Sequence, residues 1–68
     1  MAKLYKAVDK DDGEISAFIV RDDGTVCISH WLASDDAEIY MTKQSFMRQR
    51  PTKNGMEYAI NPILMAEW

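Results

Sequence analysis

The stretch DDGEISAFIVRDDGTV, residues 11–26, decides the fold because it contains the same turn twice. Asp-Asp-Gly occurs at 11–13 and again at 22–24, each time between two runs rich in β-branched and aromatic residues. In a three-residue hairpin loop the first two residues take right-handed helical angles and the third takes the left-handed conformation, which suits Asp, Asp and Gly in that order. The repeat therefore predicts an antiparallel meander with strands at about 3–9, 14–21 and 25–31.

The second turn also predicts which side chains share a face of the sheet. With 22–24 as the loop, Val20 lies opposite Val26, and every pair further along the two strands follows. The face that we expect to be buried carries Phe18, Val20, Val26 and Ile28. The reverse face carries Ala17, Ile19, Cys27 and Trp31. This reverse face is too apolar for a solvated surface, so another part of the chain or another molecule should cover it.

The second half of the chain predicts a helix and a further strand. Acidic residues and a capping pattern at 34–38, basic residues near 50 and Pro51 beyond them indicate a helix over 35–49. A strand over 37–42 followed by a short helix is the alternative. After a turn at 52–55, apolar residues alternate over 56–60 as in a half-buried strand, and Asn61-Pro62 should break it. The apolar tail, 63–68, is either another strand or one helical turn.

These elements predict the α+β class in a single small domain over residues 1–68: a three-stranded antiparallel meander, one helix packed on the sheet and a C-terminal β-strand. The chain is acidic, with a net charge of -3, and its one cysteine cannot form a disulfide within the chain. It shows no secretory signal and no apolar run long enough to span a bilayer. A cytoplasmic location is the expectation.

No residue set indicates catalysis or a bound metal, so we expect a non-enzymatic protein without a cofactor. The acidic stretch from Asp9 resembles a calcium loop only in composition, because the required ligand and glutamate positions do not line up. Cys27 and His30 stand three residues apart on one strand and so point to opposite faces, which rules out a nucleophile-base pair. One histidine cannot assemble a zinc site of its own.

Two kinds of partner remain for such a chain. A partner protein is the main prediction: a small regulatory or interaction module, of a size that suits an accessory protein of a bacterium or its phage, and with a homodimer as a further option. Its predicted contacts are apolar anchors and acidic turn tips: Ile19, Trp31, Trp68, Asp11, Asp12, Asp22 and Asp23. DNA or RNA is the alternative, bound by the basic segment 43–53 through Lys43, Arg48, Arg50 and Lys53. No membrane association is expected.

Overall fold

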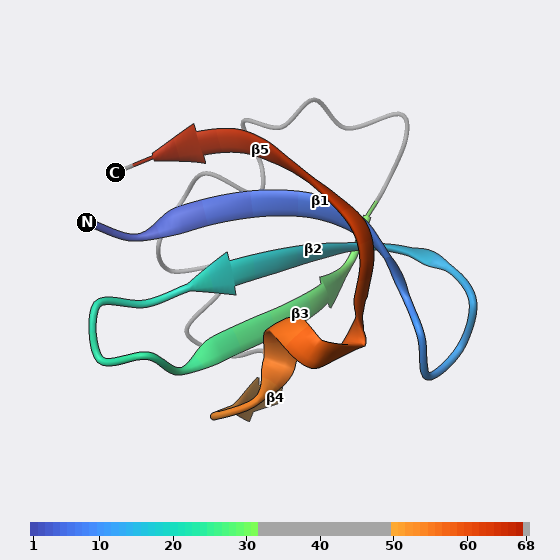
Figure 1. Cartoon of the computed structure of the whole chain (residues 1–68), viewed down its shortest axis with the longest axis horizontal. Helices are drawn as coiled ribbons and strands as arrows, with labels where there is room; N and C mark the ends of the chain where they lie inside the picture. The colour runs from blue at the N-terminus through green and yellow to red at the C-terminus, as the bar shows by residue number, and fades with distance from the viewer. Residues whose placement is uncertain (32–49, 68) are drawn as a thin grey trace.

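A computed structural model describes residues 1–31 and 50–67 of the chain. Within these ranges the protein is one antiparallel sheet in the strand order β4-β3-β2-β1-β5 (Figure 1). The strands are β1 (Lys3–Asp9), β2 (Ile15–Val20), β3 (Val26–His30), β4 (Arg50–Thr52) and β5 (Ala59–Glu67), with a 3-10 turn η1 (Gly55–Tyr58) before β5. The predicted meander is confirmed as β1, β2 and β3.

The second hairpin has the predicted loop and register. Arg21 and Thr25 close it, with the Arg21 amide donating to the Thr25 carbonyl at 2.8 Å, and Gly24 has a φ of 87°. Val20 lies opposite Val26, as expected. The first hairpin differs by one residue, because Asp9 and Glu14 pair across a loop that also includes Lys10. Its glycine is again left-handed, with a φ of 74° at Gly13.

Both faces of the sheet are buried over its centre. The first, which we call the Phe18 face, holds Ala7, Phe18, Val26 and Ile28. The second, the Leu4 face, holds Leu4, Ala17, Ile19 and Cys27. Each large side chain buried in this way contributes about 1.5–3 kcal/mol of transfer free energy. Successive residues of β2 are therefore core residues on opposite sides of the strand. In a strand with one solvated face, every second residue would instead be polar.

The link between the two edge strands covers the Phe18 face. The chain leaves β4 at one edge, crosses through η1 and enters β5 at the other edge, and Figure 1 shows η1 lying across β3. Met56 of η1 packs against the cluster on this face. Gly55 approaches β3 so closely that an added Cβ would lie 2.5 Å from the Cβ of Val26. The absence of a side chain at Gly55 thus lets the crossing lie flat on the sheet.

β5 is an edge strand with two extra residues relative to β1. Between the rungs of Ile60 and Ile63, β1 contributes one residue and β5 contributes Asn61 and Pro62. Asn61 has a φ of 52°, in the left-handed region that Asn enters more readily than most residues. Met65 is the second extra residue. Such bulges bend a strand, and proline within a sheet is found at edge strands and bulges because it has no N–H to donate to a ladder.

Three expectations need correction. The α+β class is wrong for the described residues, which form an antiparallel sheet with a single 3-10 turn and no helix packed on it. The helix predicted over 35–49, and its alternative, lie outside the described residues. The strand predicted over 56–60 is a 3-10 turn up to Tyr58, and the predicted break at Asn61-Pro62 lies inside β5. The bulge accounts for this last error, because it absorbs both residues without ending the strand.

Candidate functional site

Three exposed isoleucines gather at one end of the Leu4 face. Val8 of β1 lies opposite Ile15 of β2 and also opposite Ile60 of β5, so the three side chains form one row across three strands. Ile63 lies in the next row, opposite Lys6. The exposed fractions are 48% for Ile15, 42% for Ile60 and 61% for Ile63. We call Val8, Ile15, Ile60 and Ile63 the apolar patch.

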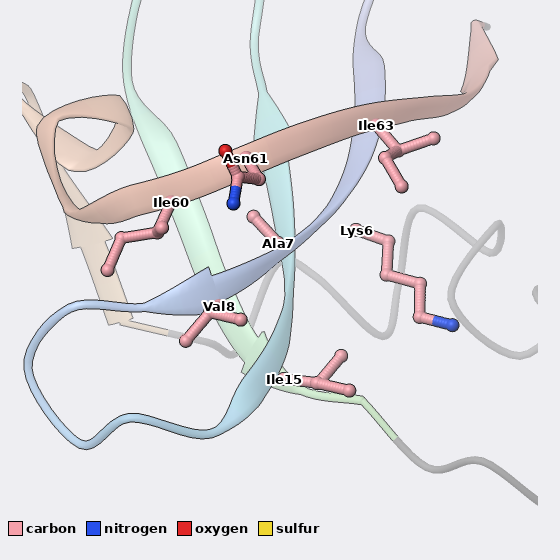
Figure 2. Close-up of a pocket in the computed structure, with 7 residues that line it drawn as sticks. All are labelled: Lys6, Ala7, Val8, Ile15, Ile60, Asn61 and Ile63. Atoms are coloured by element: carbon pink, nitrogen blue, oxygen red, sulfur yellow. The ribbon is translucent and has the colours of Figure 1, made fainter.

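A shallow depression of about 230 Å³ lies over this patch. Figure 2 shows the side chains of the apolar patch around it, from three neighbouring strands, with Lys6, Ala7 and Asn61 completing the lining. Among the described residues that line it, Lys6 alone is ionisable. A concave surface of this size and apolarity suits one or two inserted side chains better than an extended substrate.

Trp31 continues the same row directly after the end of β3. Its amide donates to the Ile15 carbonyl at 3.2 Å, which places Trp31 one rung beyond the pairing of Ser16 with His30. The Lys6 ammonium lies 5.2 Å from the centroid of the Trp31 ring, a cation-π contact. The indole is partly buried against the Leu4 cluster. One side of the patch is therefore bounded by a cation resting on an aromatic ring.

The predicted apolar anchors are distributed differently from the expectation. Ile19 is only 2% exposed and packs in the Leu4 cluster, so it has no surface to offer a partner. Trp31 keeps part of its surface and borders the apolar patch. Trp68 lies outside the described residues. The centre of the reverse face, which we expected another part of the chain or another molecule to cover, is thus buried within the protein, and only its end is accessible.

The acidic tips are exposed, but they do not form one row. A meander places its successive turns at opposite ends of the middle strand, so Asp11 and Asp12 lie at one end of β2 and Asp22 and Asp23 at the other (Figure 1). Only the first pair lies at the end of the sheet that carries the apolar patch, because their loop joins β1 directly to Ile15. The second pair is too far along the strand to share a contact surface with it.

The carboxylates of Asp12 and Asp23 accept hydrogen bonds within their own turns. Asp12 accepts a hydrogen bond from the Glu14 amide at 2.9 Å. Asp23 accepts one from the Thr25 hydroxyl at 2.6 Å and one from the Thr25 amide at 2.9 Å. These bonds, led by that from the hydroxyl, lower the pKa of Asp23 from its ordinary value of 3.8 because they favour the ionised form. The Asp22 carboxylate pairs with the N-terminal ammonium.

The basic residues are only partly placed. Arg50 begins β4, and Lys53 is exposed in the turn that follows it. Lys43 and Arg48 lie outside the described residues. The structure therefore brings two of the four predicted residues to the β4 edge, opposite in the sheet to the edge formed by β5.

Within residues 1–31 and 50–67, no group of three or more potential metal ligands comes together, and no helix has the length and apolarity to cross a membrane. Cys27 is buried on the Leu4 face, whereas His30 is exposed with Nδ1 3.5 Å from a Glu14 carboxylate oxygen. Comparison with known proteins finds no matching family model, no matching curated protein and no matching solved structure.

The residues that sequence reasoning missed are those of the apolar patch. Their signal was present in part, since the tail after Pro62 is too apolar to be solvated and Ile15 begins a strand directly after an acidic turn. What could not be seen was the placement of β5 beside β1, which brings Ile60 and Ile63 next to Val8.

Proposed function

We propose that this protein is a small non-enzymatic module that binds a partner protein through the apolar patch. The observation that carries the proposal is the exposure of Ile15, Ile60 and Ile63 together on one face of the sheet. Exposed apolar residues gathered in this way are a common feature of protein-protein contact surfaces. A cytoplasmic location is part of the same proposal and is in keeping with the free thiol of Cys27.

The surroundings of the patch favour a particular partner chemistry. The loop at the same end carries Asp11, Asp12 and Glu14, all exposed, while Lys6 is held over Trp31. An apolar centre with a charged rim is the usual arrangement of such interfaces. The proposed partner therefore presents one or two apolar side chains to the depression and basic side chains to the acidic loop. Rim charges of this kind mainly accelerate association and select the partner.

Capture from a cell lysate with variants of matched charge tests this function. Ile15→Lys places a charge within the patch. Asn54→Lys adds the same charge at an exposed turn residue before η1, and the Asn54 side chain makes no capping hydrogen bond. The wild-type chain and Asn54→Lys should retain the same proteins, and Ile15→Lys should lose them because a lysine ammonium cannot be buried there without cost.

Splitting the lysate into nuclease-treated and untreated halves separates the two classes of partner. Proteins retained in both halves, and lost with Ile15→Lys, support the proposal. Equal retention by Ile15→Lys contradicts it. Material that disappears on nuclease treatment would point instead to nucleic acid, and Lys53→Glu would then be the informative variant, since Lys53 is exposed at the β4 edge.

A further inference from the structure

The outer edge of β5 is the longest free strand edge that the described residues present. β5 runs for nine residues, and its one neighbour in the described sheet is β1. Ile63, Leu64 and Met65 are all exposed along it. Ile63 lies on the Leu4 face with Lys6, whereas Leu64 lies on the Phe18 face with Tyr5. An edge that exposes apolar side chains on both faces is suited to pairing with another strand.

The strand lacks the charges that normally prevent such pairing. From Ala59 to Ala66 no residue is ionisable, although charged residues make up 28% of the chain. Protein edges are usually protected by lysine or other charges, by proline or by bulges. β5 has Pro62 and two bulges but no charge before Glu67. Its electrostatics therefore permit a second, identical strand to approach.

An antiparallel pair of β5 strands centred on Ile63 matches the faces of the sheet. In that register Ile60 of one copy lies opposite Ala66 of the other, and both lie on the Leu4 face, since they pair with Val8 and Leu4 in their own sheets. Ala59 lies opposite Glu67, and both lie on the Phe18 face by the same reasoning. A register shifted by one residue toward the start of β5 would set side chains of opposite faces against each other.

The ends of this pairing bring no like charges together. Glu67 of one copy lies opposite the uncharged Ala59 of the other, so the two Glu67 carboxylates lie at opposite ends of the paired strands. The two-fold symmetry repeats this arrangement at the other end. Pro62 removes one donor per copy from the ladder.

We propose that two copies of this chain pair through the outer edges of β5, antiparallel about a two-fold axis at Ile63, into one continuous sheet. Because the axis is perpendicular to the sheet, both Leu4 faces lie on the same side, and the two apolar patches become neighbours across the axis. Ile63 belongs both to the apolar patch and to the pairing edge, whereas Ile15 of the patch lies two strands away from that edge, so a substitution at Ile15 tests partner binding apart from the dimer.

Light scattering coupled to gel filtration, over a concentration series of the full chain, tests the dimer. The wild type should show twice the mass of the chain. Ile63→Lys and Ile63→Glu each place like charges opposite one another at the axis, so both should show the mass of a single chain over the same range. An equimolar mixture of the two should recover the dimer, because lysine then faces glutamate. A misfolded variant could not give this recovery.

Ile15→Lys is the matched control, because it adds the same charge to an exposed isoleucine two strands from the edge. It should remain dimeric even where it loses the captured partner. A wild type with the mass of one chain at every concentration overturns the dimer, as do single variants that stay dimeric, a mixture that stays monomeric, or an Ile15→Lys chain that dissociates. Partner capture is judged from Ile15→Lys alone: loss of the captured proteins by a chain that stays dimeric supports both proposals, and their retention by that chain contradicts only the proposed function.

Discussion

At the scale of single residues, the aspartates of the turns act as local hydrogen-bond acceptors. Asp9 is buried and accepts the Asp11 amide at 2.9 Å, while Asp12 and Asp23 accept amides two residues on. This is the reason for Asp in such turns, since its short side chain reaches the following backbone. The calcium-like composition of residues 9–14 is therefore explained by turn geometry.

Asp23 gives this interpretation a pH signature. Its pKa is lowered, chiefly by the Thr25 hydroxyl, so its folded-state pKa lies below the unfolded value of 3.8. Its contribution to stability should be complete above pH 3.8 and should disappear as the pH falls through the folded pKa. Titration of the side-chain carboxyl carbon by NMR measures the pKa directly. Thr25→Val should raise the pKa toward 3.8 and Thr25→Ser should not, whereas an identical titration in both variants would contradict the assigned cause.

At the scale of elements, two glycines serve different purposes. Gly24 has a φ of 87° and open space where a Cβ would be, so it is needed for its backbone conformation. Gly55 is needed for its size, because a Cβ there would meet the side chains of Val26 and Thr52 within 3 Å. The first glycine shapes a hairpin, and the second allows η1 to lie on β3.

Substitution by alanine and by asparagine should separate these two roles. Gly24→Ala should lower the free energy of unfolding by about 1–2 kcal/mol, the cost of a left-handed alanine, and Gly24→Asn by less. Gly55→Ala should cost about 1–3 kcal/mol through overpacking, and Gly55→Asn at least as much because it is larger. Urea denaturation measures all four. If asparagine recovered stability at Gly55 as well, the close approach to Val26 would not be the cause.

At the scale of the whole molecule, the sheet buries both of its faces. Ile28 lies on the Phe18 face and Ile19 on the Leu4 face, and both are nearly inaccessible, while Ile15 on the same strand as Ile19 is half exposed. A one-sided sheet would have one of these faces in water. The difference can be measured with one substitution repeated at three positions.

Ile→Val at each position removes one methylene group in three environments. Ile19→Val and Ile28→Val should each lower the free energy of unfolding by about 0.5–1.5 kcal/mol, and Ile15→Val should leave it nearly unchanged. Thermal or urea denaturation at one protein concentration checks this. If Ile19→Val left the free energy of unfolding unchanged while Ile28→Val lowered it, the Leu4 face would be solvated.

The sequence by itself determined the meander, because loop length, glycine position and alternation are local: the order Asp22-Asp23-Gly24 sets the turn, and the turn sets the pairing of Val20 with Val26. Only the tertiary structure decided that Ile19 is core and that Ile15, Ile60 and Ile63 are exposed together. Their proximity depends on β5 joining β1, a contact between residues more than fifty positions apart that no local pattern encodes. Non-local pairing is governed by which surfaces remain to be covered once the local elements have formed. The proline shows the same limit, because its local effect predicts the end of a strand, whereas pairing with β1 continues β5 past Pro62 through a bulge.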